Sequence, residues 1–217
     1  MGEDRRMTQS SSPVRIGGRL SLMLFSKQYL MLAERGLKED PSGTARDVVL
    51  SVAYVQRHCL ELIIKDLILG CFQISELQPL AGEAPAAVKP PGWLHEFEKL
   101  VPNLRQALGS VGYGSAPEIG PLAKLAQKYI DLERGSPERF RYAHVEKFVN
   151  GKAPPHSFEQ AVDIPVHDLQ AELRAVYRDC GDLDNERSLY IQLYDESGAL
   201  FQKAVELGNI DLGLDEK

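Results

Sequence analysis

A long apolar run with helical spacing, from about Val48 to Phe72, constrains the fold of this chain more than any other feature. Charged or titratable residues interrupt the run, so it lacks the roughly 20 nearly uncharged residues of a membrane-spanning helix. It therefore predicts a long, central helix that does not enter a membrane. Its apolar residues recur every three or four positions, at Val48, Val52, Val55, Cys59, Leu62 and Leu69.

Further amphipathic segments with the same period flank this run, and Gly-, Pro- and Ser-rich loops separate them. No series of alternating strands is present. The sequence therefore predicts an all-α fold, an up-and-down bundle of about five to six helices with long loops. The other expected helices span about residues 19–37, 93–108, 122–132, 163–180 and 184–207.

Local signals predict where several of these segments begin and end. Thr44, with Asp47 three residues later, is typical of the cap that starts a helix, here the central one. The fourth helix is expected to stop near Pro137, because proline disfavours helix in the residue before it. Beyond it, Asn150-Gly151 favours a turn and a small hairpin.

One helical domain over residues 17–209 is expected from a chain of 217 residues. Residues 1–16 are polar and Ser-rich, which predicts a disordered tail that is neither a signal peptide nor an anchor. Residues 210–217 are expected to form an acidic tail.

The cysteines and histidines lack the spacing of a metal site. None forms a Cys-x-x-Cys or His-x-x-x-His pair, so neither a metal nor a cofactor is predicted. The apolar or helical surroundings of the three cysteines are typical of reduced, buried thiols, which favours a cytoplasmic location. The residues considered are His58, Cys59, Cys71, His95, His144 and Cys180.

The formal net charge of −6 predicts a surface that repels nucleic acid as a whole. A phosphate-bearing partner would therefore need a local basic patch, and no motif specific for DNA is present. Such a patch lies between residues 134 and 152 and contains Arg134, Arg139, Arg141, His144, Lys147 and Lys152.

Within this patch, residues 139–144 place two guanidiniums, a phenol and an imidazole in one short segment. Arginine matches the geometry of phosphate oxygens, and histidine exchanges protons near neutral pH. Arg139 and His144 are therefore candidate catalytic residues, and Arg141, Tyr142 and Lys147 candidate substrate-binding residues. Alternatively, these side chains only pack and form hydrogen bonds.

A second set of candidates lies on the expected central helix. Arg57, His58, Glu61 and Lys65 are spaced by three or four residues around Glu61, so they form one polar stripe on an otherwise apolar helix. One interpretation is a solvated or salt-bridged seam. If the stripe is buried, it indicates a shared pocket or an interface, and these residues become candidates for substrate binding.

Three stretches of the chain resemble the HEPN superfamily, small helical bundles of bacterial toxin–antitoxin, phage-defence and nucleotide-binding systems. Residues 53–69 resemble its His-x-x-Glu-x-x-x-Lys helix, and residues 93–100 resemble its His-Asp-Leu-x-x-Leu helix start. Residues 139–144 resemble its Arg–His motif, with four residues between Arg139 and His144.

The resemblance implies a protein that contacts RNA or a nucleotide, with a metal-independent ribonuclease site. In that site His144 is the acid/base group for attack by the 2′-hydroxyl, and Arg139 stabilises the charged phosphorane. One histidine serves one proton transfer at a time, and active family members pair two copies. The resemblance therefore also implies a symmetric homodimer.

The resemblance also fits a protein without catalytic activity. Phe140-Arg141-Tyr142 resembles a segment of family members with no assigned nuclease activity, which implies that Arg141 and Tyr142 anchor the loop against the central helix. Our hypothesis is that Glu61 or Asp66 would then be the partner of Arg141. The alternative function is a helical interaction module that binds a protein partner or itself. Its anchors would be Trp93 or the face of the last helix that carries Tyr190 and Tyr194.

Overall fold

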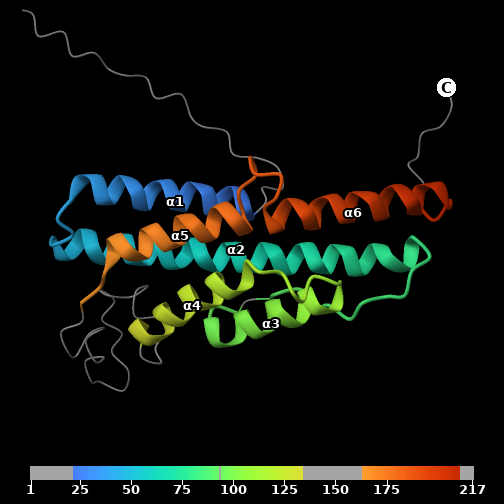
Figure 1. Cartoon of the computed structure of the whole chain (residues 1–217), viewed down its shortest axis with the longest axis horizontal. Coiled ribbons are helices and arrows are strands. Elements are labelled where there is room, and N and C mark those ends of the chain that lie inside the picture. The colour runs from blue at the N-terminus through green and yellow to red at the C-terminus, as the bar shows by residue number, and fades with distance from the viewer. Residues whose placement is uncertain (1–21, 93, 134–162, 211–217) are drawn as a thin grey trace, which may run out of the picture.

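The computed structural model describes residues 22–92, 94–133 and 163–210, and over these ranges it contains helices and no strand (Figure 1). This confirms the predicted all-α bundle. The six helices of the described residues are α1 (Leu22–Glu39), α2 (Arg46–Leu80), α3 (Phe97–Ser110), α4 (Ile119–Glu133), α5 (Val166–Cys180) and α6 (Leu189–Glu206).

The 35-residue helix α2 is the spine of the bundle. Figure 1 shows it crossing the middle of the molecule, with α1 and α6 along one side and α3 and α4 along the other. The helix α1 runs antiparallel to it, while α5 and α6 follow one another along it in its own direction. The helices α1, α3, α5 and α6 make the more extensive contacts with α2, whereas α4 packs mainly on α3 and α5.

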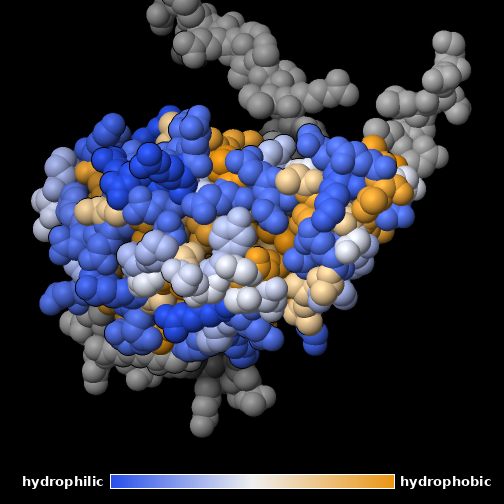
Figure 2. All heavy atoms as spheres, turned by 45° about the vertical axis from the view of Figure 1, so that its right-hand side comes forward, coloured by the Kyte–Doolittle hydropathy of each residue, from blue (hydrophilic) through white to orange (hydrophobic). Residues whose placement is uncertain are grey.

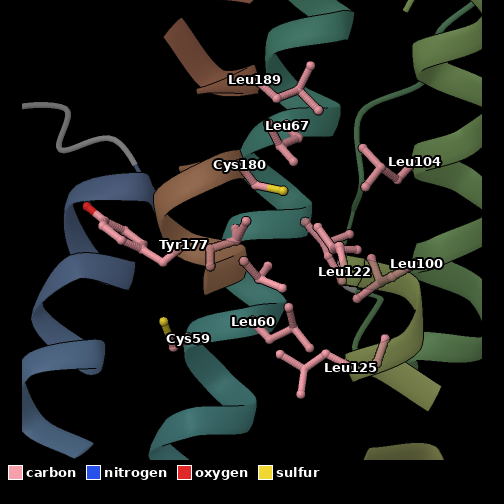
Figure 3. Close-up of a cluster of buried hydrophobic side chains, with 14 of the residues drawn as sticks. Cys59, Leu60, Leu67, Leu100, Leu104, Leu122, Leu125, Tyr177, Cys180 and Leu189 are labelled. Carbon is pink, nitrogen blue, oxygen red and sulfur yellow. The ribbon is translucent and has the colours of Figure 1, made fainter. Parts of the chain in front are cut away.

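The core lies where the apolar faces of these helices meet α2. Figure 3 shows side chains of the neighbouring helices gathered with Leu60 and Leu67 of α2 in one cluster. Each fully buried leucine of this cluster stabilises the fold by about 1.5–3 kcal/mol. The labelled partners are Leu100 and Leu104 of α3, Leu122 and Leu125 of α4, Tyr177 and Cys180 of α5, and Leu189 of α6.

The start of α2 differs from the prediction. Its N-cap residue is Ala45, and no side chain caps it, so the expected cap by Thr44 is wrong. Instead, a carboxylate oxygen of Asp40 accepts a hydrogen bond of 2.7 Å from the backbone N–H of Ala45. Asp40 lies in the turn after α1, so one side chain both joins the two helices and satisfies a donor at the helix start.

The other end of α2 lies eight residues beyond the expected Phe72, at Leu80. Ile74 is fully buried in this extension, and Leu77 lines a groove together with Tyr194 and Phe201 of α6. The side-chain amide of Asn209 donates to the carbonyl of Leu80. Packing against α6 therefore stabilises a segment in which the sequence signal for helix had faded. Pro79 lies in the last turn, so it interrupts the helical hydrogen bonds only next to the end of the helix.

Several other helix limits are also shifted from those expected, whereas α5 ends at Cys180 as predicted. The helix α3 begins at Phe97, after residue 93, and α6 begins at Leu189, after residue 184. Ser188 caps α6, and its hydroxyl accepts a hydrogen bond from the N–H of Ile191. The predicted hairpin at Asn150-Gly151, the tail 1–16 and residues 211–217 lie outside the described residues.

A buried carboxylate ties α1 to the spine. Asp66 of α2 accepts a hydrogen bond of 2.7 Å from the backbone N–H of Met23, in the first turn of α1.

The expected burial of the cysteines is confirmed, because Cys59, Cys71 and Cys180 are all buried free thiols. No helix in the described part of the chain is long and apolar enough to cross a membrane.

Substitution of Gly36 by alanine tests the close approach of α1 to α2. A Cβ at position 36 would lie 2.6 Å from Cγ2 of Val52, a stiff, buried side chain. We expect Gly36→Ala to lower the free energy of unfolding by about 1–3 kcal/mol in urea denaturation followed by circular dichroism.

Gly198→Ala is the matched control, because Gly198 is also helical but nothing lies within 4 Å of the added carbon. We expect it to raise the free energy of unfolding by up to about 1 kcal/mol through helix propensity. Equal effects of the two substitutions would contradict the predicted clash.

Candidate functional site

The structure brings the polar stripe of α2 together at a buried position. Arg57 and Glu61 each have only 1% of their surface exposed, and Lys65 has 8%. Of the two alternatives in the first interpretation, the stripe is therefore salt-bridged and not solvated. The other candidates, Arg139, Arg141, Tyr142, His144 and Lys147, lie outside the described residues, as does Trp93.

Glu61 is the centre of the cluster. One carboxylate oxygen, Oε1, accepts hydrogen bonds from Lys65 Nζ at 2.9 Å and from His95 Nδ1 at 2.7 Å. The other, Oε2, accepts from Arg57 Nη1 at 2.6 Å, and Nδ1 of His58 lies 3.9 Å from it. A single buried carboxylate thus holds cationic and titratable groups from α2 and from the segment before α3.

Arg57 connects this carboxylate to two other parts of the fold. Its Nε donates to Glu133, the last described residue of α4, and its Nη2 donates to the backbone carbonyl of His95 at 2.7 Å. The guanidinium also lies over the ring of Phe97, 4.7 Å from its centre. Arginine suits this position because its rigid fork pairs with several acceptors at once.

His58 lies at the exposed side of the cluster, between two aromatic rings. It stacks on Tyr54 at 6.0 Å between ring centres, with planes only 4° apart. Tyr29 of α1 meets the same imidazole edge-on at 4.7 Å. The side chain of His58 is 20% exposed, so this aromatic group borders the surface next to the buried charges.

His95 belongs to the cluster but was not among the site residues predicted from the sequence. The signal for it was present, because residues 93–100 match one of the three HEPN-like stretches. The contact to Glu61 spans 34 residues of sequence, and no local spacing predicts it.

The pKa of Glu61 lies below its ordinary value. Burial opposes ionisation, but the hydrogen bonds from Lys65 and His95 and the charges of Lys65 and Arg57 outweigh that effect. Glu61 is therefore ionised at neutral pH and acts only as an acceptor.

Glu133 behaves in the opposite way. Burial raises its pKa to about 7, because the contact with Arg57 does not fully compensate for desolvation and the carboxylates of Glu98 and Glu61 add repulsion. The charge of the whole cluster therefore changes near neutral pH: with Glu133 protonated, Arg57 and Lys65 outnumber the single carboxylate of Glu61.

Chemically, the arrangement offers an imidazole oriented by a buried carboxylate, a lysine and an aromatic border. These groups suit an anionic ligand with an aromatic part. Among the described residues, no group of three or more His, Cys, Asp or Glu side chains is arranged to hold a metal ion.

Comparisons with known proteins identified no relative of this chain. No protein-family model, curated protein or solved structure matches the chain.

The buried cluster predicts a large effect for Arg57→Gln. The substitution leaves the carboxylates of Glu61 and Glu133 without their shared cation, and breaking a buried pair in this way costs about 3–5 kcal/mol. We expect a loss of that size in urea unfolding. Arg174→Gln is the control, because Arg174 pairs with Glu34 while 65% exposed, and its loss should cost at most about 1 kcal/mol. Similar losses of stability in the two variants would show that Arg57 contributes no more to the fold than an exposed ion pair does.

Glu133→Gln tests the raised pKa. Between the ordinary value of 4.5 and about 7, the folded state keeps a proton that the unfolded state releases, so stability due to this group falls as pH rises. We expect the free energy of unfolding of the wild type, relative to Glu133→Gln, to fall by on the order of 2–3 kcal/mol between pH 5 and pH 8. A difference that stays flat or grows with pH would contradict this assignment.

Proposed function

We propose that this protein is a HEPN-like protein that contacts RNA or a nucleotide in the cytoplasm, in a bacterial defence or stress system. The observation that carries the proposal is the convergence of Arg57, Lys65 and His95 on the buried carboxylate of Glu61. Two of the three stretches that resemble the HEPN superfamily supply these residues, although they lie far apart in sequence. Buried polar clusters of this kind are costly to maintain, and a ligand site is a reason to keep one.

Arg57 also supports a link to the third stretch. It bonds to Glu133, and Arg139 follows Glu133 after five intervening residues. In this proposal, His144 exchanges the proton of an attacking 2′-hydroxyl and Arg139 stabilises the phosphorane, giving a metal-independent ribonuclease. A homodimer would supply the second histidine that the reaction needs.

A second candidate function is a helical interaction module, and one surface favours it. Tyr194 and Phe201 of α6 are 64% and 41% exposed, and together with Leu77 of α2 they line an open groove of about 550 Å³. Figure 2 shows hydrophobic residues at the surface toward the end of the molecule where α6 ends. Exposed aromatic side chains of this kind serve as anchors for a protein partner or a second copy.

Cleavage of RNA in the presence of EDTA tests the first proposal. We expect the wild type to cut single-stranded or structured RNA and to leave 2′,3′-cyclic phosphate ends, because the 2′-hydroxyl is the nucleophile. Arg139→Ala and His144→Ala should each lower the rate by at least about 100-fold, the contribution typical of acid–base and electrostatic groups. The products are separated by electrophoresis and their ends identified by mass spectrometry.

His167→Ala is the control, because His167 is an exposed histidine at the start of α5 whose ring lies beside Gly43, in the turn between α1 and α2. Cleavage that survives both variants would exclude this site. If the folded wild type neither cuts nor binds RNA, the interaction module becomes the better proposal.

A further inference from the structure

His95 is fixed at two points although it lies outside any helix. Its backbone carbonyl accepts a hydrogen bond from Arg57, and its ring nitrogen Nδ1 contacts Glu61 at 2.7 Å. A third of its side chain, 33%, is nevertheless exposed. A histidine that only filled space before α3 would not require both a buried carboxylate and a buried guanidinium to orient it.

The contact with Glu61 also determines which ring nitrogen of His95 carries a proton and which one can contact a ligand. Because an ionised carboxylate only accepts hydrogen bonds, Nδ1 must carry a proton. The remaining ring nitrogen, Nε2, is therefore the one through which His95 can contact a ligand. In the neutral ring Nε2 accepts a hydrogen bond, and in the charged ring it donates one to an anion.

We propose that His95, positioned by Glu61, contacts the phosphate group of a nucleotide ligand through Nε2. The class of ligand, a nucleotide, rests on the proposed function. The new element is the residue that recognises its phosphate group. His95 is the ligand-contacting group, and Glu61 is a positioning residue.

The neighbours of His95 support a phosphate over a neutral ligand. Lys65 donates to the same oxygen of Glu61 as His95, so its ammonium lies within a few ångströms of the imidazole. Below pH 7 Glu133 is largely protonated, and positive charge is then in excess. An anion at Nε2 would be stabilised by this charge, because interactions are screened less near a buried cluster than in water.

The aromatic border favours a ligand that also carries a base. His58, itself within 4 Å of Glu61, stacks on Tyr54, and both rings are half-buried. Aromatic side chains beside a cationic group form the usual platform for a nucleobase.

His95→Asn separates the contact with Glu61 from the contact with the ligand. The Asn amide nitrogen occupies nearly the position of Nδ1, so it preserves the hydrogen bond to Glu61, but it offers nothing at Nε2. The probes are AMP, inorganic phosphate, adenosine and a short RNA without terminal phosphates. Their binding is followed by calorimetry and by the ¹⁵N signals of the His95 ring at fixed pH.

We expect AMP and inorganic phosphate, but not adenosine, to shift the Nε2 signal in the wild type. The free protein should show the form with its proton on Nδ1, and Glu61→Gln should lose this preference. His95→Asn should weaken AMP binding at least tenfold while leaving urea unfolding unchanged, and His167→Asn should alter neither. Binding of the RNA alone would assign the site to an internal phosphodiester instead of a terminal phosphate.

Undiminished AMP and RNA binding by His95→Asn would overturn this inference. If Arg139→Ala and His144→Ala abolish that binding under the same conditions, the proposed function stands without it. If RNA is not cut but AMP binding still depends on His95, the inference stands and the ribonuclease proposal fails. If none of the probes binds to the folded wild type, both proposals are wrong.

Discussion

The burial of the Arg57 guanidinium is the constraint on which the rest of this structure depends. A charge inside a helical bundle is destabilising by several kcal/mol unless its neighbours pair with it. Arg57 is satisfied by Glu61 one turn later in α2, by Glu133 at the end of α4 and by the carbonyl of His95 before α3. These polar contacts hold three segments at one point, in addition to the apolar packing of α3 on α2 and α4.

The same contacts that satisfy Arg57 also build the candidate site. Glu61 neutralises the buried guanidinium, and in doing so it is available to orient His95 and to hold Lys65. Structure and proposed chemistry consequently share residues, so that a substitution of Glu61 acts on both. His95 is different, because its carbonyl has the structural contact with Arg57, while its ring contacts Glu61 through Nδ1 and, in our proposal, a ligand through Nε2. This separation makes His95 the position where the two roles can be distinguished.

The two buried carboxylates show how the number of donors decides the charge of a group. Glu61 receives hydrogen bonds from Arg57, Lys65 and His95, and its pKa is lowered despite burial. Glu133 has Arg57 as its partner in the cluster and feels repulsion from Glu98 and Glu61, so burial dominates and its pKa rises to about 7. The net charge of the cluster near neutral pH is therefore set by Glu133, and an anionic ligand would favour its protonated form.

The sequence by itself determined the all-α class, the central position of α2 and the polar stripe around Glu61. These follow from periodicity, since residues three or four apart share a face of a helix wherever it lies. Only the tertiary structure decided that this stripe is buried and that Glu133 and His95 complete it, because those contacts span 76 and 34 residues of chain. Packing also decided the ends of the helices: α6 covers the extension of α2 to Leu80, and Asp40 replaces the cap that Thr44 was expected to provide. Local patterns specify which face of a helix is apolar, whereas the partner of a buried charge depends on which segments the fold brings beside it.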